Sequence, residues 1–291
     1  MKKKITFLIN PISGGIDKTS FPNLIDTFLN KDLFNYSFTF STSPAHLVKI
    51  AKDAAEEGVD CVVAVGGDGT LNSVAAALVH SPINLAVVPM GSGNGLARHL
   101  GISMNPGKAI ATINQYKSVK IDSGMANNQF FINVAGAGFD AHVSQKFAEA
   151  PRRGLITYAK ISIGEFARYP NETYELTLDG QTVSHEAFII CVGNGSQYGN
   201  NAYITPTAEV NDGMFNITVV KPFRIIDMPI LAYDLFAKRV NKSYLASTFT
   251  PKSILIKRAS AGVFNIDGEP IEMDRDVEIK MLSASVNILV P

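Results

Sequence analysis

The sequence is poor in cysteine: its 291 residues include only Cys61 and Cys191, each inside an apolar, strand-like run. Thiols in such runs are typical of buried side chains in a reducing compartment, and they argue against a disulfide framework or a cysteine-based metal site. We therefore expect a cytoplasmic protein.

The chain also lacks an excess of either charge, because 26 basic side chains balance 26 acidic ones. A neutral chain has no overall field that would hold nucleic acid or an anionic membrane, so we expect no nucleic-acid partner. No stretch approaches the roughly 20 apolar residues that cross a bilayer, so membrane contact is expected to be peripheral. The basic start "MKKKITFLIN" has too short an apolar run for a signal peptide, and it is expected to form a first buried strand.

Short β-rich runs alternate with helical patterns over residues 1–121, as in "KITFLIN", "FPNLIDTFLNKD" and "YSFTFS". This alternation predicts an α/β domain with a largely parallel sheet and helices on both faces. Residues 122–291 instead carry many short β runs separated by Gly, Asn, Asp and Pro, which predicts an antiparallel β-sandwich. Two helices are expected to interrupt it, at 154–169 and 225–240.

We therefore expect two domains, 1–121 and 122–291, with the last strand free to return to the first domain. The sequence shows no fixed-period repeat, and no low-complexity linker separates the two domains. Such domains are expected to be packed together, and the cleft between packed domains is a favoured ligand site.

Three glycine-bearing turns follow strands of the first domain: "NPISGG" at 10–15, "GGDGT" at 66–70 and "MGSGNG" at 90–95. The carboxyl ends of parallel strands meet at one sheet edge, where ligands bind. Glycine allows close backbone approach, and the N–H groups at a following helix start attract an anion such as phosphate. Hydroxyl donors could come from Thr70 and Ser92, and amide donors from Asn72 and Asn94.

Asp68 does not fit a turn that only binds anions, because a carboxylate repels phosphate unless a cation intervenes. A magnesium ion bridging Asp68 and a nucleotide resolves this conflict. The ordinary alternative is a glycine turn without a ligand, which is common in α/β folds. The sequence lacks a GxxxxGK[ST] loop, and "GGDGT" does not continue into a GxGxxG fingerprint, so any phosphate site belongs to another class.

These motifs resemble those of the diacylglycerol kinase catalytic-domain family, which includes bacterial soluble lipid kinases, sphingosine kinases and ceramide kinases. The resemblance extends to "VGNGSQYGNNAYITPTAEVNDGMFNI" at 192–217 and "FNIDGEPIE" at 264–272. It implies a first domain with the fold of NAD kinases and phosphofructokinases, and a β-sandwich that carries the lipid site. It also implies an ATP- and Mg²⁺-dependent kinase that transfers the γ-phosphate to the hydroxyl of a lipid substrate.

The resemblance assigns roles by position. Asp212 matches a magnesium ligand, assisted by the backbone carbonyls of Glu209 and Met214, and Asp68 would hold the catalytic metal. Glu269 matches the proton acceptor, with Asp267 as its competitor. Nucleotide-contacting positions would be Asn10, Pro11, Ser13, Gly14, Gly15, Ser41, Gly66, Gly67, Asp68, Gly69, Thr70, Leu71, Asn72, Gly91, Ser92, Gly93 and Asn94.

Chemistry supports a carboxylate that takes the proton of an alcohol during phosphoryl transfer. The alternative reading of "IDGEP" is a plain hairpin turn, since Asp-Gly between β runs is a strong hairpin signal. On the substrate side, Asp140 or His142 could orient the acceptor hydroxyl. His142, placed at the end of an apolar strand, could equally be a structural residue.

"APRRGLITYAK" could turn Arg152 and Arg153 toward an anionic bilayer, or be an ordinary helix with a solvated end. An exposed sandwich edge could pair with a second copy as a homodimer.

Alternative functions are an NAD kinase-like enzyme and a catalytically inactive lipid- or nucleotide-binding protein. The acceptor stays open among diacylglycerol, a sphingoid base, phosphatidylglycerol and another long-chain alcohol.

Overall fold

The computed structural model describes residues 1–15, 18–150 and 154–291. The chain divides into two compact units, one formed by Met1–Ile121 with Ala284–Pro291 and the other by Asp122–Ser283. Within the described residues, no helix combines the length and the apolar composition needed to cross a membrane.

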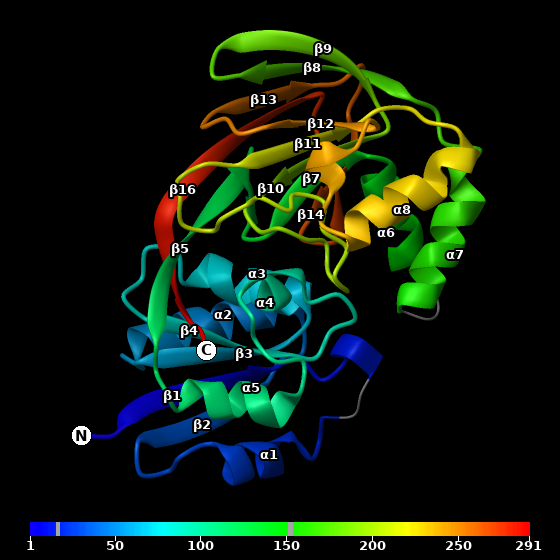
Figure 1. Ribbon diagram of the computed structural model, residues 1–291. Coiled ribbons are helices and arrows are strands. Elements are labelled where there is room, and N and C mark those ends of the chain that lie inside the picture. The colour runs from blue at the N-terminus through cyan, green and yellow to red at the C-terminus, as the bar shows by residue number, and fades with distance from the viewer. Residues whose placement is uncertain (16–17, 151–153) are drawn as a thin grey trace. The chain divides into compact units, whose positions relative to one another are not determined.

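The first unit is built on a parallel sheet in the order β2-β1-β3-β4 (Figure 1). β3 is buried along its whole length, as an uninterrupted apolar run between two helical layers requires. The strands are β1 (Lys3–Ile9), β2 (Phe34–Phe40), β3 (Cys61–Gly66) and β4 (Asn84–Pro89).

Helices cover this sheet on both faces: α2 packs with α3, and α1 packs with α5. The predicted α/β class is therefore confirmed. The helices are α1 (Phe21–Phe28), α2 (Pro44–Glu56), α3 (Asp68–Ala77), α4 (Gly95–His99) and α5 (Pro106–Ile113), with a 3-10 turn η1 (Ser13–Gly15).

One long strand, β16 (Asp276–Leu289), takes part in the sheets of both units. Its first half pairs antiparallel with β13 (Ile254–Lys257), and its last residues pair parallel with β4. The chain end therefore supplies a strand to the unit in which the chain begins.

The second unit is an antiparallel β-sandwich, as predicted. One sheet has the order β12-β11-β10-β7-β14-β15, and the other joins β16, β13, β8 and β9, with β5 and β6 attached. The remaining strands are β5 (Ser118–Ala126), β6 (Gln129–Phe131), β7 (Val134–Gly138), β8 (Glu172–Leu178), β9 (Gln181–Ala187), β10 (Ile189–Gly193), β11 (Asn216–Val220), β12 (Ala246–Phe249), β14 (Gly262–Ile266) and β15 (Glu269–Met273).

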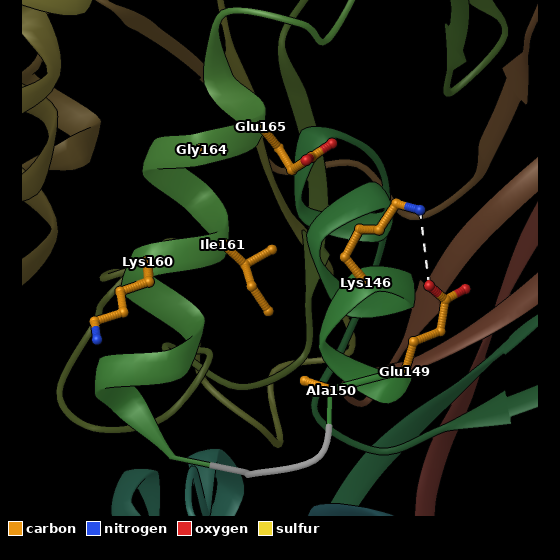
Figure 2. Close-up of a pocket in the computed structure, with 7 residues that line it drawn as sticks. All are labelled: Lys146, Glu149, Ala150, Lys160, Ile161, Gly164 and Glu165. Atoms are coloured by element: carbon orange, nitrogen blue, oxygen red, sulfur yellow. Dashed lines mark ion pairs between the residues drawn. The ribbon is translucent and has the colours of Figure 1, made fainter.

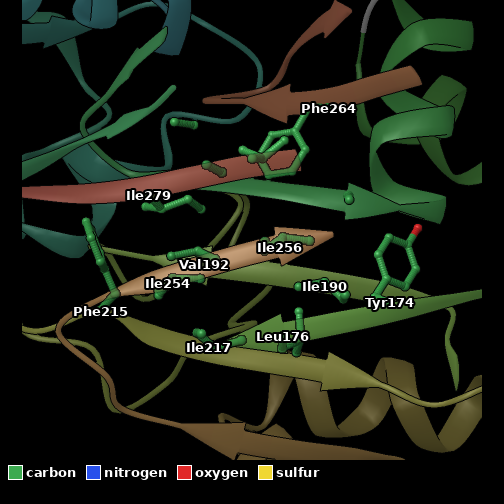
Figure 3. Packing of buried hydrophobic residues seen from close by; sticks show 14 of the residues in the cluster. Tyr174, Leu176, Ile190, Val192, Phe215, Ile217, Ile254, Ile256, Phe264 and Ile279 are labelled. Atoms are coloured by element: carbon green, nitrogen blue, oxygen red, sulfur yellow. The ribbon is translucent and has the colours of Figure 1, made fainter. Parts of the chain in front are cut away.

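Apolar side chains from both sheets form the core of the sandwich (Figure 3). Phe131 stacks on Phe215 in this core, with ring centroids 5.5 Å apart. Alternate residues of β8 point inward, as Tyr174 and Leu176 do, because successive side chains of a strand lie on opposite faces of its sheet.

Three helices complete the second unit and bury a second apolar cluster beside the sandwich, which includes Phe139, Val143, Phe188 and Leu231. They are α6 (Phe139–Ala148), α7 (Leu155–Phe166) and α8 (Met228–Phe236), with short 3-10 turns η2 (Ile225–Asp227) and η3 (Val240–Lys242). The helices expected at 154–169 and 225–240 are present.

Helix α6 was missed, and the placement of His142 at the end of a strand is wrong. β7 ends at Gly138, whose φ of 107° is a conformation that glycine adopts without steric cost. α6 begins at the next residue. A Cβ at Gly138 would lie 2.5 Å from the carbonyl oxygen of Phe188. His142 therefore lies in the helix that follows this turn.

Candidate active site

The three glycine loops begin at the same edge of the first unit's sheet. Ile9 of β1 is paired with Val65 of β3, and Gly66 of β3 is paired with Pro89 of β4, so the strands end at the same level. The parallel order that the sequence predicts thus brings 10–15, 66–70 and 90–95 together.

These loops touch through their backbones. A Cβ at Gly14 would lie 1.9 Å from the carbonyl oxygen of Met90, and a Cβ at Gly91 would lie 2.4 Å from the Cα of Gly67. Gly14 also has a φ of 68°. Side chains at these positions would separate the loops, so glycine is needed for their contact as well as for access by a ligand.

Several predicted ligand donors already have protein partners. The Asn10 side-chain amide donates to the Thr70 hydroxyl at 3.0 Å. The Asn94 amide group receives a hydrogen bond from the Gly91 N–H and donates to the Gly91 carbonyl, at 3.0 and 2.8 Å. These side chains hold the loops in shape. Anion binding would therefore depend mainly on the backbone N–H groups of the loops.

Asp68 joins the second loop to the third. Its carboxylate accepts the backbone N–H groups of Asn94 at 2.7 Å and Gly95 at 2.8 Å. A carboxylate at the first N–H groups of a helix is stabilised there by hydrogen bonding and by the helix dipole. A carboxylate is also the kind of oxygen ligand that a divalent cation such as magnesium takes.

The other predicted nucleotide contacts lie in the glycine loops or in segments next to them. Ser41 is buried beside the end of β1, since its N–H donates to the carbonyl of Ile9 at 2.9 Å. Lys18, which is not one of the predicted contacts, lies next to the first loop, where its buried ammonium donates to the carbonyl of Ser13. Pro11 and Gly15 lie in the first loop, Gly69, Leu71 and Asn72 in the first turns of α3, and Ser92 and Gly93 in the third loop.

In the second unit, Asp267 and Gly268 form the tight turn between β14 and β15. Both have positive φ values, 49° and 90°, as a two-residue hairpin turn of this kind requires. The Asp267 carboxylate is buried and accepts three backbone N–H groups, from Ile132, Asn133 and Val134, each at 2.9 Å. These contacts fix the hairpin against the strand that precedes it in the sheet.

Glu269 differs from Asp267 in exposure. It is the first residue of β15 and is exposed, two residues after the buried Asp267. A general base must reach the proton of its substrate, and of the two carboxylates Glu269 is the accessible one.

The loop of residues 209–214, which was predicted to bind a metal, is stabilised by hydrogen bonds from backbone N–H groups to carboxylates. The Asp212 carboxylate accepts the Met214 N–H at 3.0 Å, and Glu209 and Asp212 are exposed. Within the described residues, no group of three or more His, Cys, Asp and Glu side chains converges as a metal site. A cation here would need carbonyl oxygens as well, and such an all-oxygen donor set suits magnesium.

Asp122 is a residue that the sequence analysis missed at this loop. It is buried, its carboxylate accepts the Gly213 N–H at 2.8 Å, and its own N–H donates to the carbonyl of Val210. Asp122 and Gly213 are 91 positions apart in the chain, so no local pattern could have connected them.

Asp140 points into the interior of the second unit. It is buried, and one carboxylate oxygen accepts the Tyr198 hydroxyl at 3.0 Å and the Asn265 amide at 3.2 Å. Burial raises the pKa of Asp140 from 3.8 to about 6, although these two hydrogen bonds act in the opposite direction.

His142 faces the other way, toward α7, where its Nε2 lies 2.8 Å from Glu165 Oε2. This contact lowers the pKa of Glu165. Asp140 and His142, which the sequence placed together on the substrate side, therefore point to different surroundings.

A pocket of about 420 Å³ lies between α6 and α7 (Figure 2). Glu165 is one of its lining residues, and Lys146 and Glu149 form an ion pair at 3.7 Å on its α6 side. On α7, Ile156 and Ile163 are exposed. Arg152 and Arg153, on which the membrane-facing interpretation of this helix depended, lie outside the described residues.

Two family models match the chain in succession. Residues 4–126 match the diacylglycerol kinase catalytic domain, and residues 133–289 match the YegS C-terminal NAD kinase beta sandwich-like domain. The two matches together span the first unit's loops and the second unit's hairpin.

Curated relatives cover most of the chain. A Serratia proteamaculans protein named "Probable lipid kinase YegS-like" is 28% identical over 250 residues, covering 84% of this chain and 80% of that protein. A Pseudomonas putida protein of the same name is 29% identical over 231 residues, covering 77% and 75%. The crystal structure of a diacylglycerol kinase from Bacillus anthracis has a TM-score of 0.76 at 22% identity, covering 99% of this chain and 97% of that one, which shows the shared fold.

Proposed function

This chain belongs to the lipid kinase family in which a diacylglycerol kinase catalytic domain is followed by a YegS-type β-sandwich domain, and on that basis we propose that it transfers the γ-phosphate of ATP to a lipid hydroxyl. The observation that carries the proposal is the backbone contact of three glycine loops at the ends of β1, β3 and β4. Such an edge offers N–H groups at close range, which is the chemistry that phosphate groups need.

We assign the donor side to this edge. The loops of residues 10–15, 66–72 and 91–94 bind the ATP phosphates mainly through the backbone, since Asn10, Thr70 and Asn94 are occupied with one another and with the loops. Asp68 keeps the second and third loops in register, and we assign its carboxylate as an oxygen ligand of magnesium. A magnesium ion bound there would neutralise charge that develops on the transferred phosphate.

On the acceptor side, Glu269 is assigned as the base that takes the proton of the lipid hydroxyl. Its exposure supports this role, as does the position of Glu269 directly after a rigid two-residue turn. Asp267 is a positioning residue, because its carboxylate is buried against three backbone N–H groups. The burial of Asp267 and the exposure of Glu269 therefore support Glu269 as the proposed base.

The loop around Asp212 is assigned a structural magnesium ion, with the carbonyls of Glu209 and Met214 as further ligands. Asp122 supports this loop from inside the unit through the Gly213 N–H. Carboxylate and carbonyl oxygens are the ligands magnesium prefers, and the loop exposes both.

The test of the function is identification of the labelled product. The protein is incubated with magnesium, γ-labelled ATP and a total bacterial lipid extract, and the products are separated and identified. Label in a phosphorylated lipid is the expected result. Label in NADP when NAD is supplied, with none in lipid, would replace the proposal by NAD kinase activity, and the absence of label from both under nucleotide-binding conditions would indicate an inactive binding protein.

A further inference from the structure

The second unit exposes an apolar surface on η2 and α8, which we call the α8 face. It consists of Ile225, Ile226, Ile230, Tyr233 and Phe236, whose exposed fractions run from 40% to 71%. Residues 226, 230 and 233 are spaced by four and three positions, so they follow one side of the helical segment. Figure 1 shows α8 beside α6 and α7 in this unit.

The opposite side of α8 is apolar as well. Leu231 is buried in the cluster that α6, α7 and α8 share, and Leu235 packs against it. A helix that is apolar on both sides is usually covered on both sides, by the protein core or by another apolar medium. The core of the second unit covers one apolar side of α8, and the α8 face is the apolar side that this core leaves exposed.

Within residues 221–244, the segment that carries the α8 face, the exposed charged side chains are all basic. Asp227 is mostly buried, lies near Arg224 and accepts the Tyr244 hydroxyl at 3.0 Å, and Asp234 is buried. The exposed side chains that carry a charge between residues 221 and 244 are instead Lys221, Arg224, Lys238, Arg239 and Lys242. In a chain with equal numbers of acidic and basic residues, this segment therefore carries a local excess of exposed positive charge.

We propose that the α8 face docks on the surface of an anionic lipid bilayer, with its apolar side chains in the interface and the surrounding Lys and Arg side chains on the lipid headgroups. In such a surface, apolar side chains suit the boundary of the acyl chains, and the basic side chains beside them suit the anionic headgroups. Tyr233 and Tyr244 are exposed there, and tyrosine is the kind of side chain that suits a boundary between water and lipid.

A second copy of the chain fits the face less well. A symmetric dimer places the same patch on both partners, so the basic side chains of one copy would meet those of the other. Like charges facing each other across an interface oppose association. Charge complementarity therefore favours an anionic partner, and the apolar anchors favour a bilayer.

The inference rests on the proposed lipid kinase function for its biological meaning, since docking would bring the enzyme to a substrate held in a membrane. Vesicle binding can be measured without catalysis, by co-sedimentation of the full chain with vesicles of equal parts phosphatidylcholine and phosphatidylglycerol. Binding is expected on these vesicles, at least about tenfold weaker on pure phosphatidylcholine, and weakened by added salt.

Two variants test the two parts of the face. Ile226→Ser combined with Tyr233→Ser and Phe236→Ser is expected to weaken binding at least about tenfold, because the apolar anchors are lost. Lys221→Glu combined with Lys242→Glu is expected to weaken it by at least about fivefold for each charge removed, with the largest effect at low salt. All of these side chains are exposed, so the thermal midpoint is expected to stay at the wild-type value.

Matched controls come from exposed residues elsewhere. Leu33→Ser with Phe38→Ser removes exposed apolar side chains from the first unit, and Lys52→Glu with Lys252→Glu reverses two exposed charges. Both controls are expected to bind vesicles as the wild type does. Equal binding by wild type and both face variants overturns the proposal, and so does a face variant that dissociates a dimer in sedimentation velocity while the wild type ignores anionic vesicles.

Activity toward a lipid dissolved in detergent micelles separates this inference from the proposed function. Phosphorylation of micellar lipid together with vesicle binding that the face variants do not change means that the docking face is wrong and the function right. Vesicle binding that depends on the face, without phosphorylation of any lipid, means the reverse.

Discussion

Asp68 and Asn94 are 26 positions apart in the chain, yet the Asp68 carboxylate accepts the Asn94 N–H at 2.7 Å and so ties two glycine loops together. The same carboxylate accepts the Gly95 N–H at 2.8 Å. Asp68 therefore has a structural role in addition to the metal-binding role proposed for it, and both roles use the same side chain.

Asp68→Asn is expected to reduce both activity and stability. The amide can accept only through its one oxygen, so one of the two N–H groups loses its partner, at a cost of about 1–3 kcal/mol in unfolding free energy. Urea titration measures this loss, and labelled phosphate transfer is expected to fall by orders of magnitude. Asp53→Asn on the exposed side of α2 serves as the control and is expected to change neither. Full transfer by Asp68→Asn would exclude a catalytic metal at this carboxylate.

Gly91→Ala tests whether the loop contact is required. The new Cβ would lie 2.4 Å from the Gly67 backbone, which forces the second and third loops apart. We expect nucleotide affinity, measured by calorimetry, to fall at least about tenfold, because a loop displaced by about 1 Å loses its aligned N–H groups.

Gly164→Ala is the matched control for that substitution. Gly164 lies in α7, none of the residues that the structure describes comes within 4 Å of a Cβ built there, and its φ is not positive. Alanine is expected to stabilise the helix by up to about 1 kcal/mol and to leave nucleotide affinity unchanged. Unchanged affinity in Gly91→Ala as well would mean that the loops bind nucleotide without touching.

Glu269→Gln separates catalysis from folding. Because the side chain is exposed, the thermal midpoint is expected to be that of the wild type, whereas kcat is expected to fall about 10²–10⁴-fold if the base is lost. Asp267→Asn is the comparison, and it is expected to destabilise the second unit by about 2 kcal/mol or more, since hydrogen bonds to a buried charge are lost. A normal kcat for Glu269→Gln would return the role of base to Asp267.

Asp140→Asn is expected to change how stability depends on pH. The folded pKa of Asp140 is raised from 3.8 to about 6, so between these values the folded state binds more protons than the unfolded state, and unfolding free energy falls as pH rises. The difference corresponds to about 3 kcal/mol, reached above about pH 6.

An amide at position 140 does not titrate, and its oxygen can still accept the Tyr198 and Asn265 hydrogen bonds. Urea titrations from about pH 4 to about pH 8 are therefore expected to show a flatter profile for the variant and greater stability than the wild type at the upper end. Identical pH profiles for the two proteins would show that Asp140 is charged at a normal pKa in the folded state.

Local patterns account for the parts of the site that the sequence revealed. "NPISGG", "GGDGT" and "GSGNG" each follow an apolar run, and the parallel order of those runs was enough to bring them to one edge. The Asp-Gly hairpin was also recognisable from a local pattern, because a two-residue turn depends on the residues within it. Helix α6 was hidden because the glycine-rich end of β7 resembles a loop and because its N-cap, Gly138, has no side chain that could cap the helix.

The amino-acid sequence by itself determined the alternation of strands and helices, the change to a sandwich after residue 121, and the glycine turns, because each depends on neighbours in the chain. The tertiary structure decided which carboxylates are buried and which are accessible. Asp267 finds its N–H donors more than 130 positions away, Asp122 meets Gly213 across 91, and Glu269 stays exposed. The role of a carboxylate depends on its solvation and hydrogen-bond partners, and these exist only once distant segments have come together.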